Sequence, residues 1–253
     1  MSQNYQHVSY LWEDSKAASL SGNEVDLFIY RSNILGADLR ITNYGGGNTS
    51  VKIKDKDPLT GQETEVMWIK GSGGDIGTLT KSGCAALYLE RLRNLENVYR
   101  GIEFEDEMVE LFNHCIYDLA SKAPSIDTAL HGFLPFKHID HLHPDAAIAI
   151  AAAKDGKKIT QELFSGTIGW VEWKKPGFEL GLQLKQCLDE NPGIKAKGKF
   201  VSERFAYLDD AVTTQKLIQF SSDTQTNVTF SLPQMHCSSC IFLLENQIGR
   251  AHV

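Results

Sequence analysis

The sequence predicts an α/β fold, because short strand-like runs alternate with longer runs whose apolar residues recur at helical spacing. Two glycine-rich loops separate several of these runs, as expected for turns between regular elements. The expected strands are residues 38–42, 51–53, 65–70 and 168–173. The expected helices are residues 23–35, 80–94, 105–119, 146–153 and 178–190.

The helix predictions rest on apolar spacing and on charge. Leu87, Leu89 and Leu92 are among the apolar positions that indicate an amphipathic helix over 80–94. The helix expected over 105–119 begins with acidic residues, which the helix dipole favours at an N-terminus. These patterns, interleaved with the strands, favour a sheet packed against helices.

Length, charge and cysteine content restrict the function. The 253 residues suffice for one large domain or two modest ones. The formal charge of −7 argues against a general nucleic-acid binder, which needs a basic face, but leaves room for a small phosphorylated substrate. No apolar run approaches the roughly 20 residues of a membrane span, and the N-terminus has no signal-peptide core, so we expect a cytoplasmic protein. Five cysteines without a secretory signal disfavour a disulfide framework.

The first glycine-rich stretch is Gly45-Gly46-Gly47-Asn48-Thr49-Ser50. Glycines let backbone amides approach an anion with no side chain in the way, and the three polar residues that follow add side-chain donors. A phosphate cradle and a flexible hairpin therefore both fit this stretch.

The second glycine-rich stretch is Gly71-Ser72-Gly73-Gly74-Asp75-Ile76-Gly77. It lies between an expected strand and an expected helix, where helix-end amides can bind phosphate. Its G-x-G-x-x-x-G spacing differs from the G-x-G-x-x-G of dinucleotide-binding folds, and Glu90 falls inside an expected helix. A dinucleotide site is therefore disfavoured.

Five of the eight histidines fall between His114 and His143. His141 and His143 are one residue apart, so in an extended segment both imidazoles point to the same side and can bind one metal ion. A catalytic zinc site normally has three protein ligands, and the sequence offers two. Asp127, fourteen residues before His141, supplies a carboxylate base beside the ion, although taken alone it also suits a helix cap.

These motifs resemble the class II aldolase/adducin family in their order and approximate spacing. The likeness covers about residues 7–194, and residues 130–145 resemble the aldolase half of bifunctional rhamnulose-1-phosphate aldolase/short-chain dehydrogenase proteins. The resemblance implies an α/β/α sandwich around a mostly antiparallel sheet, usually assembled as a homotetramer.

The resemblance also implies an activity and a set of site residues. The expected reaction is retro-aldol cleavage of a ketose 1-phosphate, such as rhamnulose 1-phosphate, to dihydroxyacetone phosphate and lactaldehyde. Zinc, or another divalent metal, is expected on His141 and His143, and Asp127 stands where the family usually has a glutamate as acid/base. The expected phosphate contacts are Gly47, Asn48, Thr49, Ser72 and Gly73.

The sequence departs from the family after residue 194, because no Gly-Gly-His-Gly segment follows to donate the third histidine. Residues 195–247 instead resemble the lead-in and start of a metal-binding domain of heavy-metal-transporting P-type ATPases, and residues 248–253 resemble translated adapter sequence. We therefore expect a chimera: a truncated aldolase domain over 1–194, joined near Asn191 to an incomplete C-terminal appendage. Without the third ligand, we expect this chain to be feeble or inactive as an aldolase.

Two other hypotheses stay open. Cys237 and Cys240 form a C-x-x-C, a spacing suited to soft metals, so one alternative is a copper-binding fragment. The other is a non-catalytic, adducin-like scaffold that keeps the family fold. The missing third histidine favours the scaffold, whereas the retained His141, His143 and Asp127 favour the enzyme.

Overall fold

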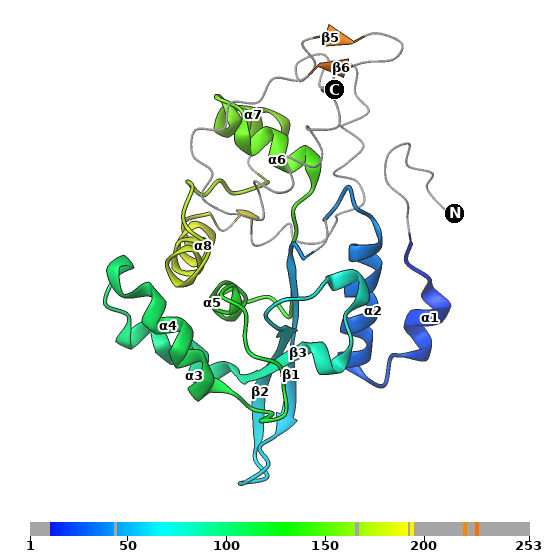
Figure 1. Ribbon diagram of the computed structural model, residues 1–253, viewed down its shortest axis with the longest axis vertical. Coiled ribbons are helices and arrows are strands. Elements are labelled where there is room, and N and C mark those ends of the chain that lie inside the picture. Colours follow the sequence, from blue (N-terminus) through cyan, green and yellow to red (C-terminus); the bar gives the residue numbers. More distant parts are fainter. Residues whose placement is uncertain are drawn as a thin grey trace. The chain divides into compact units, whose positions relative to one another are not determined.

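The structure, a computed structural model, describes residues 11–42, 45–164, 167–191, 193–194, 220–221 and 226–227 (Figure 1). The described residues fall into two compact units. The first draws on Met1–Pro144 and Gly169–Lys197, and the second on Asp145–Ile168 and Gly198–Val253. Among the described residues, every helix is too short or too polar to cross a bilayer.

A four-stranded sheet organises the first unit, with strand order β3-β2-β1-β4 and every neighbouring pair antiparallel. The strands are β1 (Asn48–Lys56), β2 (Glu63–Lys70), β3 (Cys84–Tyr88) and β4 (His138–His141). The turn between β1 and β2 is stabilised by Asp57, whose carboxylate accepts hydrogen bonds from the Leu59 and Thr60 amides. The predicted α/β fold with a mostly antiparallel sheet is confirmed.

Helices cover both faces of this sheet. α2 (Glu24–Ala37) packs on one face, in a buried cluster that includes Phe28, Val51, Val66 and Trp68. On the other face lies a second cluster, which contains Met67 and Leu87 from the strands together with Leu92, Phe133 and Phe178. These three belong to α3 (Leu89–Asn94), α5 (Thr128–Phe133) and α8 (Phe178–Glu190). Successive strand residues enter opposite clusters, as the pleat requires.

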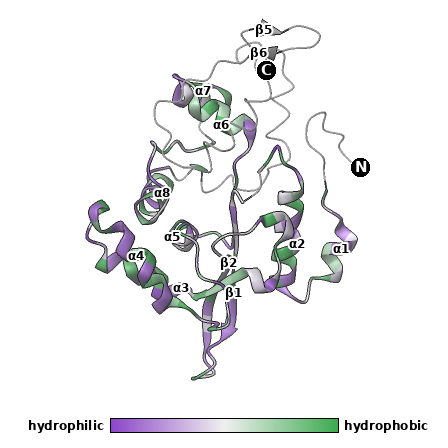
Figure 2. Cartoon of the chain, viewed as in Figure 1, coloured by the Kyte–Doolittle hydropathy of each residue, from purple (hydrophilic) through white to green (hydrophobic). Residues whose placement is uncertain are grey.

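The remaining helices are short. α1 (Asp14–Ser19) precedes α2, whose N-cap Asn23 accepts hydrogen bonds from the amides of Val25 and Asp26 at 3.1 and 3.2 Å. α4 (Glu105–Leu111) runs into a 3₁₀ turn. The second unit contains α6 (Asp145–Ala152), α7 (Gly156–Phe164), β5 (Phe220–Ser221) and β6 (Thr226–Asn227). α6 is built mainly from alanine and isoleucine and is predominantly hydrophobic (Figure 2).

The helix expected over 80–94 is wrong in its first half. Residues 84–88 form the edge strand β3, and α3 begins only at Leu89. Ala86 and Leu87 enter opposite buried clusters, so both faces of this strand are covered. The alternation of polar and apolar residues that marks a half-exposed strand is therefore missing, and a short apolar run of this kind is easily taken for a helix.

Two strand predictions are wrong, and one helix prediction is correct only in its first part. Residues 38–42 form a turn rather than a strand, because the Asp38 carbonyl accepts hydrogen bonds from the Ile41 and Thr42 amides. Residues 168–173 are irregular, and the helix expected over 105–119 is α-helical only to Leu111. The sequence patterns did not predict α1, β4 or α7.

The predicted domain boundary near residue 194 is not tested. Most of residues 195–253, with Cys237, Cys240, the expected appendage and the expected tail, lie outside the described residues. These statements stay predictions.

Candidate functional site

The pairing of β1 with β4 brings two distant motifs together. In this antiparallel pair, Asn48 lies directly opposite His141, and Ser50 lies opposite Ile139. The glycine-rich stretch and the histidine pair, more than ninety residues apart in the sequence, are thus neighbours at one edge of the sheet. β1 begins at Asn48, so the three polar residues predicted to belong to a loop are buried strand residues instead.

The two histidine side chains converge. His141 Nε2 and His143 Nε2 are 3.1 Å apart, and the ring centroids are 4.9 Å apart. Two nitrogen ligands of one tetrahedral zinc ion, each about 2.0–2.1 Å from the metal, lie roughly 3.3 Å from one another. Burial, followed by the neighbouring His141, lowers the pKa of His143, which favours the neutral imidazole that metals bind. The pair therefore fits a shared divalent cation.

Asp127 faces the histidines rather than capping a helix. It precedes α5, yet its side chain makes no capping hydrogen bond, so the cap interpretation is wrong. Its Oδ2 lies 3.5 Å from Asn48 Nδ2 and 3.7 Å from His141 Nδ1. Burial raises the pKa of Asp127, but His141 and Asn48 outweigh burial and hold it below its ordinary value. The carboxylate is therefore ionised at neutral pH.

Several polar atoms around Asp127 are buried and make no hydrogen bond within the described part of the chain. They include Asn48 Oδ1, Asp127 Oδ1, His131 Nε2 and His141 Nδ1. Buried polar atoms in proteins are normally paired, because an unpaired buried group costs about 1–3 kcal/mol. Their concentration beside converging imidazoles is the arrangement expected where a ligand supplies the missing partners.

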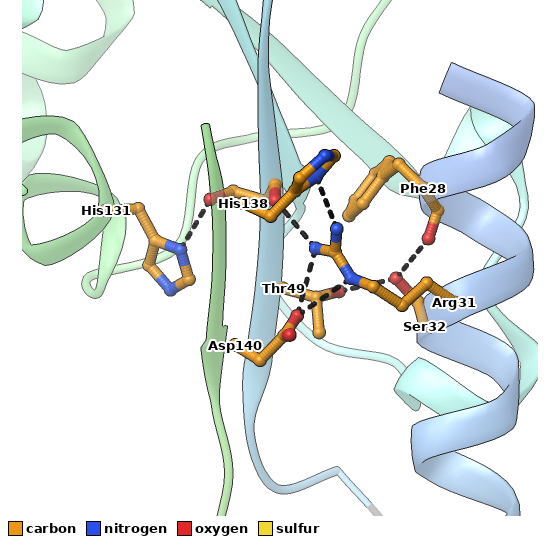
Figure 3. Close-up of polar contacts among 8 residues, drawn as sticks. Phe28, Arg31, Ser32, Thr49, His131, His138 and Asp140 are labelled. Atoms are coloured by element: carbon orange, nitrogen blue, oxygen red, sulfur yellow. Dashed lines mark hydrogen bonds and ion pairs between the residues drawn. The ribbon is translucent and has the colours of Figure 1, made fainter. Parts of the chain in front are cut away.

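A buried histidine lies behind this group. His131 is fully buried in α5, and its Nδ1 lies 2.7 Å from Ser50 Oγ. Figure 3 shows its ring on the side of β1 away from Ser32 and Thr49. Burial, reinforced by His141, lowers the pKa of His131 to about 3, so the ring is neutral. Since His131 follows Asp127 by four residues, helical spacing is the sequence signal that places it near the carboxylate.

Only some of the predicted phosphate contacts of the first glycine-rich stretch lie in the site. Asn48 lies in the site, and Gly47 has a positive φ of 74°. A Cβ on Gly47 would come within 2.7 Å of the His141 carbonyl oxygen, so glycine is needed there for close packing against β4. Thr49 points away from the site, because its hydroxyl bonds that of Ser32 at 2.7 Å on the α2 face.

The second glycine-rich loop joins the segment that leads to Asp127. The Ser72 amide donates to the Ala123 carbonyl at 2.9 Å, and Ser72 and Gly73 are exposed. Lys70, the last residue of β2, is buried; burial lowers its pKa, while Asp127 and Asp75 oppose that shift. The buried Lys70 ammonium interacts electrostatically with Asp127 and is therefore a candidate anion-binding group. The sequence spacing did not single it out.

A complete metal centre is not found in the part of the chain that the structure describes. No group of three histidine, cysteine, aspartate or glutamate side chains there could hold a metal ion. His141 and His143 thus provide two ligands of the expected three.

The sequence and the fold both match known proteins. Residues 29–202 match the family described as Class II Aldolase and Adducin N-terminal domain. The chain belongs to the class II aldolase/adducin family. It is 41% identical over 185 residues to YuxG of Bacillus subtilis (strain 168), an uncharacterized oxidoreductase. That match covers 73% of this chain but only 26% of YuxG, so the chain spans about a quarter of this relative's length.

A solved structure of the same family shows the same fold. The N-terminal class II aldolase domain of a conserved protein from Thermoplasma acidophilum superposes with a TM-score of 0.59 at 25% sequence identity. The match covers 74% of this chain and 80% of that domain. The class II aldolase fold predicted from the glycine and histidine motifs is therefore confirmed.

Proposed function

We propose that this chain is a zinc-dependent class II aldolase domain whose reaction is cleavage of a ketose 1-phosphate, such as rhamnulose 1-phosphate, to dihydroxyacetone phosphate and lactaldehyde. Its turnover is expected to be feeble, because the described residues supply only two of the three zinc ligands. One observation carries the proposal: Asn48, Asp127, His141 and His143 converge at one edge of the sheet. The family membership supports a metal-dependent aldolase in general.

Asp127 is the proposed acid/base. Its Oδ1 is buried without a partner and its charge is retained at neutral pH, so it can accept the proton of the hydroxyl on carbon 4. As that proton leaves, the bond between carbons 3 and 4 breaks, carbon 4 becomes the aldehyde of lactaldehyde, and the electron pair stays with the three-carbon phosphate. The same proton returns to carbon 3 and completes dihydroxyacetone phosphate. Asn48 orients the carboxylate by donating to Oδ2.

His141 and His143 are the residues that would hold the divalent ion. When bound, such an ion supplies a Lewis acid that polarises the ketose carbonyl. Asn48, Ser72 and Gly73 are proposed phosphate contacts, with Lys70 adding a buried positive charge. YuxG is named as an oxidoreductase and is much longer than this chain, which supports a parent protein that also contains a dehydrogenase half. We also propose that the protein assembles as a homotetramer and is located in the cytoplasm.

The test combines metal content with turnover. Zinc is measured by elemental analysis in the full chain and in a His141→Ala/His143→Ala variant, and cleavage of rhamnulose 1-phosphate is followed by the release of dihydroxyacetone phosphate. Zinc bound to the unaltered chain and lost in the double variant supports the metal site. An unaltered chain with no zinc and no cleavage would refute the proposal.

A second candidate function is a non-catalytic, adducin-like scaffold. It is favoured by the lack of a third ligand for His141 and His143 among the described residues. The same measurements separate the two functions, since a scaffold folds normally but neither retains zinc at these histidines nor releases dihydroxyacetone phosphate.

A further inference from the structure

Arg31 extends from α2 and contacts β1 and β4 at the same time (Figure 3). Its Nη2 donates to the Ser50 carbonyl oxygen of β1 at 2.9 Å. Its Nε donates to Asp140 Oδ1 at 3.2 Å, its Nη2 lies 3.0 Å from the same oxygen, and its Nη1 contacts His138 Nδ1. One guanidinium therefore connects a helix and two strands.

The strand that Arg31 holds carries a proposed metal ligand. β4 has only four residues and lies at the edge of the sheet, where β1 is its only strand neighbour within the described part of the chain. Short edge strands open locally more easily than central ones. Asp140 directly precedes His141, and the two side chains point to opposite faces of the strand. Fixing Asp140 on the α2 face therefore fixes the direction of the His141 imidazole on the other face.

The geometry of the contact explains why arginine serves here. A guanidinium presents five donors in a rigid planar fork, so it can reach a carboxylate, a carbonyl and an imidazole together, whereas a lysine ammonium is a point charge on a flexible stem. The Arg31 side chain is 17% exposed, so solvent screens its ion pair with Asp140 less than it screens a surface pair. A second charged link between α2 and this region joins Lys137, just before β4, to Glu24, and these side chains are 51% and 44% exposed.

We infer that Arg31 is a positioning residue for the proposed metal site, holding β4 against β1 so that the His141 imidazole meets that of His143. This inference rests on the proposed function, because the orientation of His141 matters through the ion it would bind. The polar contacts of Arg31 are with Ser50, His138 and Asp140 rather than with the histidine pair.

Cobalt(II) binding to the full chain tests the inference. Dissociation constants are measured by competition with a chromophoric chelator for the unaltered chain and for Arg31→Met, Arg31→Lys and Lys137→Met, after circular dichroism has shown that each is folded. Loss of a group that orients a metal ligand typically weakens metal binding roughly 10- to 100-fold. We expect that loss in Arg31→Met, a smaller loss in Arg31→Lys, and a change of less than about twofold in the exposed control Lys137→Met. Equal affinities in Arg31→Met and the unaltered chain, or an equal loss in Lys137→Met, would overturn the inference.

Amide hydrogen exchange in the metal-free chain separates this inference from the proposed function. Arg31→Met should speed exchange in β4 and in the β1 residues paired with it, while the β1–β2 hairpin keeps its protection. Should the unaltered chain bind no cobalt, the proposed function fails, and exchange alone then decides: faster exchange confined to β4 and its partners supports the role of Arg31, and unchanged exchange overturns it.

Discussion

The two faces of the paired strands β1 and β4 carry similar polar residues, but these residues differ in whether they find hydrogen-bond partners within the protein. On the α2 face, the Thr49 hydroxyl bonds Ser32, which also donates to the Phe28 carbonyl. Arg31 on the same face bonds the carboxylate of Asp140. These contacts form a closed network within the protein.

The α5 face has buried polar atoms left over. Asn48 Oδ1, Asp127 Oδ1 and His131 Nε2 make no hydrogen bond among the described residues, although all three are buried. Evolution tolerates that cost of about 1–3 kcal/mol per group mainly where a ligand or a reaction uses the atoms. Unpaired atoms are not confined to this face, since Asn33 Oδ1 of α2 and Trp68 Nε1 in the α2-face cluster are also buried without a partner. The α5 face differs in that its unpaired atoms gather beside one carboxylate and a converging histidine pair.

The largest expected effect is on turnover in Asp127→Asn. The amide keeps the size of the side chain but cannot accept the substrate proton, so kcat for aldol cleavage should fall by about 10²- to 10⁴-fold. Zinc content should remain, because His141 and His143 are unchanged. Both are measured on the same preparation. The control is Asp106→Asn, which removes one negative charge from a side chain that is 93% exposed; equal losses in the two variants would contradict the role given to Asp127.

The next effect is on stability as the pH falls. Burial lowers the pKa of His131 from 6.5 to about 3, so between these values the unfolded chain binds a proton that the folded chain does not. Stability contributed by the neutral ring is therefore present near pH 7 and is lost as the pH falls below about 6.5. At about 1.4 kcal/mol per pH unit, the loss between pH 7 and pH 5 is about 2 kcal/mol. Urea unfolding at both pH values should show a smaller loss in His131→Gln, and equal losses in the two proteins would contradict this assignment.

Local patterns predicted most of the helices and the two central strands. The segment 178–190 is a helix with a regular apolar stripe, and the β1–β2 hairpin follows from its turn residues. β3 was missed because both of its faces are buried, which removes the period-two pattern on which a strand prediction depends. Local sequence patterns are therefore insufficient to predict a strand that is buried on both faces.

The sequence predicted which residues belong to the site, but it did not predict which of them contact one another. The spacing of His141 and His143 predicted that their imidazoles converge. Asn48 was expected in a loop, because the hydrogen-bonding partners of this polar segment lie 79 and 81 residues away in the sequence. These contacts depend on how α5 packs against β1, which residue spacing does not encode.

A smaller effect is expected from Ser50→Ala on the α5 face. The substitution removes the hydroxyl that contacts His131 Nδ1 at 2.7 Å, and the His131 ring is fully buried. A second nitrogen of the ring is then unpaired, so the free energy of unfolding should decrease by about 1.5 kcal/mol. Urea unfolding at pH 7 measures it, and an unchanged stability would show that this hydrogen bond contributes nothing.

The smallest effect is expected from Thr49→Val, the matched change one residue earlier on the α2 face. Valine keeps the β-branched shape that strands favour, and Ser32 keeps its hydrogen bond to the Phe28 carbonyl at 2.8 Å after the Thr49 hydroxyl is lost. No buried group loses its last partner, so the decrease in unfolding free energy should be about 0.5 kcal/mol. If Thr49→Val destabilised the protein as much as Ser50→Ala, the two faces would be equally dependent on their hydroxyls. The distinction between a closed structural network and an open functional one would then be wrong.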